Sequence, residues 1–182
     1  MKDLRVQRTY ILLKEAFFKL LAKKPFEEIK VNDICNLAMI HRTTFYHHFQ
    51  DKYDLVNWYF EKLVLKSFEE MNQGGSLQEA LNLKFAFIEQ EHAFFKEAFK
   101  SNDYNNLIHY DFCCIYDFYK KFIYKKTGKD LSKDIDFLLN MYCRGSVDMT
   151  VDWVLNDMPI KKEEIVQYLM DAIPDKLEAY MI

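Results

Sequence analysis

The chain has 182 residues, of which 50% are hydrophobic and 16% aromatic, enough apolar material for a packed core and too much for a disordered chain. Only 4 glycines and 3 prolines interrupt it, which favours long helices over a turn-rich β fold. The net charge of −3 alone argues against a nucleic-acid binder, but the charge is unevenly distributed. Residues 1–60 carry 10 Lys/Arg against 7 Asp/Glu, whereas residues 61–182 carry 15 Lys/Arg against 21 Asp/Glu.

This division of charge places a basic head on an acidic body and directs any contact with DNA to one end of the molecule. No apolar run approaches the roughly 18 residues of a membrane span, and the first residues lack an apolar signal core, so a cytoplasmic protein is expected. The four cysteines form no C-x-x-C pair and have no histidine at metal-ligand spacing. Buried, reduced thiols are expected, with no metal and no cofactor.

Apolar periodicity predicts an all-α fold of about nine helices. Their expected spans are 5–22, 31–38, 42–49, 52–71, 77–91, 92–100, 104–126, 132–156 and 161–173. Asp51 is the predicted N-cap of the fourth helix and Ser76 of the fifth, while Pro174 should end or kink the last. Two domains are predicted, residues 1–51 and residues 52–182.

The segment from Lys30 to Leu55 carries the most specific pattern in the chain. Phe45 and Phe49 lie four residues apart, so they share a helix face that can be buried. Thr43, Thr44 and His47 fall on another face. A helix that buries aromatic rings and displays hydroxyls and imidazoles suits a DNA groove, so nucleic-acid recognition is the first hypothesis.

The same run resembles the DNA-binding helix-turn-helix of the TetR family of transcriptional regulators. The matching positions are Val31, Ile34, Ala38, Thr44-Phe45-Tyr46, His48-Phe49, Lys52 and Leu55, after a helix from Arg5 to Ala22. Two positions depart from the family, which usually has glycine in place of Met39 and a small polar residue in place of His41. Because glycine supplies a positive φ at little cost, Met39 implies either a strained turn or a slightly different one.

Nine residues of this segment are predicted to contact DNA. Those expected at base edges or sugars are Thr43, Thr44 and His47. Those expected at phosphates, as the resemblance implies, are Tyr46, His48 and Lys52. Further candidates at helix starts are Lys30, Asn32 and Arg42. The alternative for each is an ordinary solvated helix face.

The larger second domain is where the resemblance implies a small-molecule effector and a dimer interface. The predicted pocket residues are Phe85, Phe95, Phe99, Phe112, Tyr116 and Tyr142. The predicted interface residues are Tyr142, Gly145, Met149, Trp153, Ile165 and Leu169. For both sets the alternative is plain packing within one chain. A dimer is preferred because one recognition helix covers too few bases, and half-sites about 34–36 Å apart require two-fold symmetry.

Together these features predict a DNA-binding transcriptional regulator, a ligand-responsive homodimeric repressor of a pseudo-palindromic operator. An alternative keeps the DNA-binding head but places the body under the control of a protein partner. No G-x-S-x-G, phosphate-binding glycine loop or paired carboxylate site is present in the sequence, so no catalytic residues and no enzymatic activity are expected.

Overall fold

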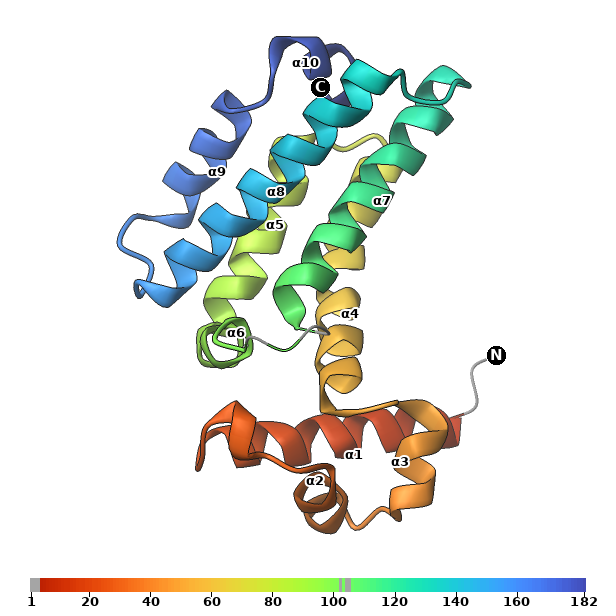
Figure 1. Cartoon of the computed structure of the whole chain (residues 1–182), viewed down its shortest axis with the longest axis vertical. Helices are drawn as coiled ribbons and strands as arrows, with labels where there is room; N and C mark the ends of the chain where they lie inside the picture. Colours follow the sequence, from red (N-terminus) through yellow and green to blue (C-terminus); the bar gives the residue numbers. More distant parts are fainter. Residues whose placement is uncertain (1–3, 102, 104–105) are drawn as a thin grey trace.

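The computed structural model describes residues 4–101, 103 and 106–182, with only the backbone at residues 65 and 70 (Figure 1). Across these residues the chain is all-helical. The elements are α1 (Leu4–Leu21), the 3-10 turn η1 (Phe26–Glu28), α2 (Val31–Ala38), α3 (Arg42–His48), α4 (Lys52–Asn72), α5 (Leu77–Gln90), α6 (His92–Phe99), α7 (Leu107–Thr127), α8 (Lys133–Leu155), α9 (Lys162–Asp171) and α10 (Asp175–Met181).

The helix boundaries follow local capping chemistry. The Asp51 carboxylate accepts from the Asp54 backbone N–H at 2.8 Å, and the Ser76 hydroxyl accepts from Glu79 N–H at 3.2 Å, as predicted for α4 and α5. The predicted start of α7 at Tyr104 lies outside the described residues, and the described helix begins at Leu107. Pro174 separates α9 from α10, a helix beyond the nine that were predicted. A helix can begin directly after Pro174 because proline suits the start of a helix.

Helices α1, α2 and α3 form a small head, and α4 leaves it to run through the body (Figure 1). The head core is apolar and aromatic: Phe17, Phe45 and Phe49 are buried. Tyr10 of α1 packs against the Phe49 ring at 5.1 Å and the Trp58 ring at 4.8 Å. These rings fasten α3 to both α1 and α4, which fixes the direction in which α3 presents its other face.

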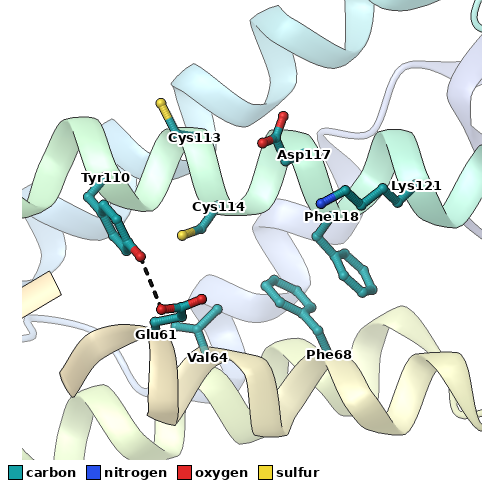
Figure 2. Close-up of a pocket in the computed structure, with 9 residues that line it drawn as sticks. All are labelled: Glu61, Val64, Phe68, Tyr110, Cys113, Cys114, Asp117, Phe118 and Lys121. Atoms are coloured by element: carbon teal, nitrogen blue, oxygen red, sulfur yellow. Dashed lines mark hydrogen bonds between the residues drawn. The ribbon is translucent and has the colours of Figure 1, made fainter. Parts of the chain in front are cut away.

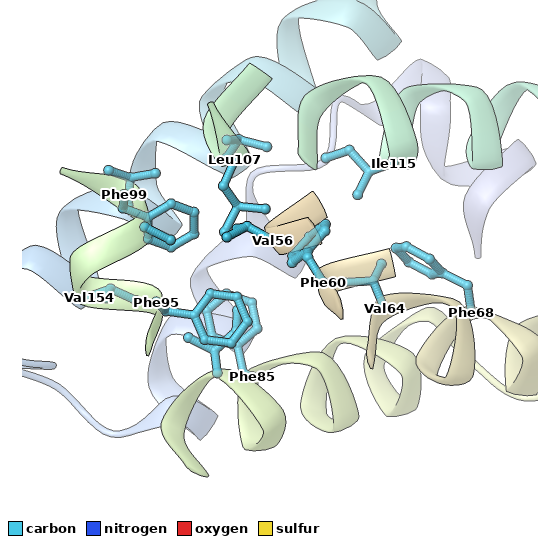
Figure 3. Packing of buried hydrophobic residues seen from close by; sticks show 14 of the residues in the cluster. Val56, Phe60, Val64, Phe68, Phe85, Phe95, Phe99, Leu107, Ile115 and Val154 are labelled. Atoms are coloured by element: carbon cyan, nitrogen blue, oxygen red, sulfur yellow. The ribbon is translucent and has the colours of Figure 1, made fainter. Parts of the chain in front are cut away.

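The body packs α4 against α5 and α7, with α8 and α9 on the opposite side and α10 against the ends of α7 and α8. Its centre is a continuous apolar cluster in which Phe60, Val64 and Phe68 of α4 lie against side chains of α7 (Figure 3). Phe60 also meets the Phe95 ring of α6 at 6.1 Å. This cluster is the hydrophobic core that holds α4 in place.

One ion pair lies inside this core. The Lys84 ammonium donates to both carboxylate oxygens of Asp111, at 2.9 and 3.0 Å, and joins α5 to α7. The Asp111 side chain has no exposed surface. Burial raises the pKa of Asp111, and the charge of Lys84 opposes that rise. Because an isolated buried charge is costly, each member of the pair depends on the other for its place in the core.

Head and body meet at a cluster of rings on α6. The Phe18 ring of α1 stacks on the Phe94 ring of α6, with centroids 5.2 Å apart and planes inclined by 12°. Tyr59 of α4 meets Phe94 edge-on at 5.2 Å and donates its hydroxyl to the Glu91 carboxylate at 3.2 Å. The head is therefore in contact with the body through α6 as well as through α4.

Candidate DNA-binding site

The turn between α2 and α3 is left-handed at Met39. This residue has φ 54° and ψ 42°, and it is 92% exposed. The backbone N–H of Met39 donates to Asn36 O at 3.2 Å and that of Ile40 to Cys35 O at 3.0 Å, the hydrogen-bond pattern of a Schellman motif. Of the two possibilities, a strained turn or a different turn, the structure has the first: the turn is left-handed, and a residue with a Cβ carries the strain.

Helix α3 presents a polar face above its buried rings. Phe45 is fully buried, while Arg42, Thr43 and His47 are exposed and Thr44 is partly exposed. Tyr46 is also exposed, and the Arg42 guanidinium lies 5.7 Å from its ring centroid. The predicted base-edge residues and Tyr46 thus share one accessible side of a helix whose other side is fixed by the head core.

His48 and Lys52, both predicted to touch phosphates, face inward instead. The His48 ring packs edge-on against Tyr10 at 5.2 Å, and burial lowers the pKa of His48, with His47 lowering it further. The Lys52 ammonium donates to the carbonyls of Phe26 and Glu27 at 2.9 and 3.0 Å, and its side chain is only 12% exposed. Lys52 therefore ties the start of α4 to η1, and its expected contact with a phosphate stays a prediction.

The candidates near the start of α2 remain accessible. Lys30 and Asn32 are exposed. The Asp33 carboxylate accepts from the Lys30 backbone N–H at 3.1 Å and from the Lys24 ammonium at 2.6 Å, and the hydrogen bond from Lys24 holds the pKa of Asp33 below its usual range. Asp33 thus orients the start of α2 and leaves the Lys30 side chain in solvent.

His41 was missed as a candidate by sequence reasoning. It is the N-cap residue of α3, it is exposed, and its imidazole forms no capping hydrogen bond. The signal in the sequence was its position directly before Arg42, where the family usually has a smaller side chain. An uncommitted imidazole here lies at the same end of α3 as Arg42 and Thr43.

The six predicted pocket residues do not surround a common cavity. Phe85, Phe95, Phe99 and Tyr142 are packed into the core, and the Tyr142 hydroxyl donates to Leu169 O at 3.1 Å. The void that Phe85 and Tyr142 line measures about 10 Å³, room for one water at most. Phe112 and Tyr116 stack on each other at 5.6 Å along α7. The correction follows from their spread over four helices with different neighbours.

The surface of α7 instead borders half-open grooves. One, of about 360 Å³, lies between α4 and α7, where Cys114 and Phe118 point toward α4 and the Tyr110 hydroxyl donates to Glu61 at 3.2 Å (Figure 2). Cys113 and Cys114 are half-buried, not fully buried as expected, and burial raises the pKa of Cys114 to about 12. Such a thiol stays protonated at neutral pH and is a poor nucleophile.

The predicted interface residues divide into two groups. Tyr142, Trp153, Ile165 and Leu169 are buried within the chain, and the Trp153 indole donates to Ile160 O at 2.8 Å. These four are therefore intrachain core, which corrects the prediction. Gly145 and Met149 are exposed, and a Cβ added at Gly145 would meet no atom within 4 Å. Within the described part of this chain, no neighbouring helix therefore lies close to the backbone at Gly145.

Among the described residues, no group of three or more His, Cys, Asp or Glu side chains is placed to hold a metal ion. No helix in the same residues combines the length and the apolar character needed to cross a membrane.

Known proteins resemble this chain in sequence and in fold. A protein of Lactococcus lactis subsp. lactis (strain IL1403), named HTH-type dhaKLM operon transcriptional activator DhaS, is 28% identical over 91 residues, which cover 50% of this chain. That alignment spans about half the length of the curated relative, 49%.

Two solved structures share the fold over nearly their whole length. The dihydroxyacetone kinase operon activator DhaS matches with a TM-score of 0.63 and 20% identity, over 96% of this chain and 98% of that one. A TetR transcriptional regulator from Streptococcus agalactiae 2603V matches with a TM-score of 0.67 and 21% identity, over 94% and 97%.

Two sequence profiles together cover most of the chain. Residues 13–58 match the profile described as bacterial regulatory proteins of the tetR family, and they include α2, α3 and the turn between them. Residues 75–175 match the TetR profile described as the C-terminal region of a transcriptional regulator. The chain is a DNA-binding transcriptional regulator that belongs to the TetR family.

Proposed function

We propose that this regulator binds a pseudo-palindromic operator as a homodimer, with α3 of each copy in the major groove. The observation that supports this most directly is the division of α3 into a buried face, anchored by Phe45 and Phe49, and an exposed face with Thr43, Thr44 and His47. Hydroxyl and imidazole groups at such a face can hydrogen-bond base edges, while Arg42 and Lys30 pair with phosphates.

Selection of bound duplexes from a random pool tests this proposal. The wild type should enrich two inverted half-sites with centres about 34–36 Å apart, or a multiple of a helical turn. Thr44→Ala and His47→Ala should change the enriched bases. Arg42→Gln should weaken binding to all sequences and reduce the salt slope by about one. A pool that shows no enrichment, or identical preferences in all variants, would contradict α3 as the reading helix.

The dimer interface is proposed on the exposed apolar side of α8 and α9. Its residues are Phe137 (69% exposed), Met141 (52%), Met149 (51%) and Tyr168 (58%), with the open backbone at Gly145 among them. An exposed apolar stripe of this kind on two neighbouring helices marks an interaction surface. Two copies related by two-fold symmetry would bury the same stripe on both sides.

We propose that the body controls DNA binding. Its filled core helps to distinguish control by a small effector from control by a protein partner. A small apolar effector needs an enclosed space, whereas the predicted pocket residues leave a void of about 10 Å³. This observation favours the alternative of a protein partner. The half-open groove between α4 and α7 is one site at which a small effector could enter the body, by separating the stacked rings of Phe68 and Phe118.

Binding experiments with groove variants separate the two modes. Cys114→Trp fills the groove from α7 and should abolish a response to any small effector, whereas a protein partner on the outer surface would still act. The sign of regulation needs its own test. We expect repression, but the similar protein in Lactococcus lactis is named an activator. A reporter behind the selected operator, with and without the regulator, decides between them.

We also propose that the protein has no enzymatic activity. We place it in the cytoplasm because its proposed partner is DNA.

A further inference from the structure

The turn before α3 contains an unfavourable residue in two respects. Met39 has φ 54°, a left-handed conformation that glycine adopts freely and that costs other residues free energy. Its side chain is 92% exposed, so no packing within the chain compensates for the strain. A glycine would give the same Schellman motif without that cost. Strain that the fold itself does not use points to a role for the side chain outside the fold.

The position of Met39 indicates what the side chain could meet. The α2–α3 turn lies at the end of the head farthest from the body, beside the first turn of α3 (Figure 1). Its neighbours Leu37, at 44%, and Arg42 are also exposed. The exposed Met39 side chain therefore stands three residues before Arg42, where the helix with the proposed base-reading residues begins.

We propose that Met39 reads a thymine methyl group in the major groove and so sets part of the operator preference. The C5-methyl of thymine is the apolar group that base edges display there. An unbranched, polarisable thioether reaches and adapts to such a group. This inference rests on the proposed entry of α3 into the major groove, but it assigns a specificity-determining contact to the turn rather than to the helix.

Replacing thymine by uracil in the selected operator tests the contact, because this removes the methyl and nothing else. With uracil at one thymine in each of the two half-sites, wild-type binding should weaken about fifteenfold, which is about fourfold for each of the two buried methyl groups. Met39→Gly and Met39→Ala should bind the thymine operator more weakly and show no uracil effect at that position. Met39→Leu, which keeps an apolar side chain, should retain most of the effect.

Stability measurements separate the side chain from its backbone. Met39→Gly should raise the melting temperature, by about 2 °C, because the strain is relieved and no packing is lost. Met39→Ala keeps the Cβ and should bring no such gain. Met158, in the body, also has a positive φ of 55°. Met158→Gly is the matched control and should leave the wild-type uracil response intact.

The outcomes distinguish this inference from the proposed function. If the wild type enriches an operator but no thymine position distinguishes it from Met39→Gly, Met39 does not read a methyl group, and the turn inference is overturned alone. Unchanged DNA affinity in Met39→Gly and Met39→Ala would also overturn the inference and would move the role of this side chain to a protein partner. If the wild type enriches no sequence, the proposed function fails first.

Discussion

The head and the body place their polar and apolar groups in opposite ways. In the head, aromatic rings such as Phe45 and Phe49 are buried, and the polar side chains of α3 face solvent. In the body, the ion pair of Lys84 and Asp111 lies in the core, while Phe137 and other apolar side chains of α8 are exposed. The body also leaves an apolar stripe on α8 and α9 exposed, the surface proposed above for a second copy.

This difference shows which interactions fix the positions of the helices in each region. The head fixes α3 by ring packing, so its contacts to DNA depend on which side chains the helix displays. The body contains charges whose burial is tolerated only in one arrangement, with Lys84 of α5 against Asp111 of α7. Packing of α5 against α7 is therefore specified by a pair of groups rather than by shape alone.

Removal of one member of the buried pair should produce the largest effect. Lys84→Met leaves Asp111 charged and unpaired in the core, and we expect the free energy of unfolding to fall by about 3–5 kcal/mol. Chemical denaturation measures this loss. The double variant Lys84→Met/Asp111→Leu should recover most of it, because two apolar groups need no partner. A double variant as unstable as the single one would contradict the pairing.

A charge on the exposed stripe of α8 should act on assembly and not on folding. In Met141→Glu each copy would bring a carboxylate into the proposed apolar interface, and we expect dimer dissociation to increase by a factor of about ten to a hundred. Sedimentation over a concentration series measures this change. Tyr124→Glu, at an exposed position of α7, is the matched control. A dimer that survives Met141→Glu would place the interface elsewhere.

Loss of the Lys52 ammonium should destabilise the head. Lys52→Met removes the charged donor from the carbonyls of Phe26 and Glu27, and hydrogen bonds to a charged group contribute about 1.5–3 kcal/mol. Thermal unfolding should show the loss, while the salt slope of DNA binding should be unchanged because this charge does not face the groove. A slope reduced by about one would restore the phosphate role that the sequence predicted.

The smallest expected effect is a pH dependence of the head. The Lys24 ammonium lowers the pKa of Asp33 in the folded chain, so ionised Asp33 stabilises the fold above its unfolded pKa of about 4. This contribution is lost as pH falls through the lower folded pKa. The difference in melting temperature between wild type and Asp33→Asn should be full at neutral pH and vanish in that acid range. A constant difference would contradict the role of the charge.

The sequence predicted the head more accurately than the body because the head is specified locally. Phe45 and Phe49 are four residues apart on one helix, and their shared burial follows from helical geometry. The inward directions of His48 and Lys52 were not predictable, since they depend on Tyr10 and on η1, which lie far away in the chain. The resemblance carried the residue types but not these partners.

In the body, the prediction of the interface was wrong where one stripe of α8 was extended over too many turns. Residues spaced by four advance about 40° around a helix at each step, so the predicted interface residues Gly145 and Trp153, eight residues apart, point about 80° apart. Gly145 is exposed, whereas Trp153 is buried against Phe85 at a ring distance of 5.4 Å. Likewise, nothing in the sequence pairs Lys84 with Asp111, since their contact exists only once α5 and α7 have packed.

The stacked rings of Phe18 and Phe94 limit how the head can move on the body. Two nearly parallel rings can slide across each other at small cost, but tilting them apart exposes both faces to water. Tyr59, held edge-on by its hydrogen bond to Glu91, closes one side of the stack. The joint therefore permits a shear of the head across α6 in one plane and resists a hinge between them.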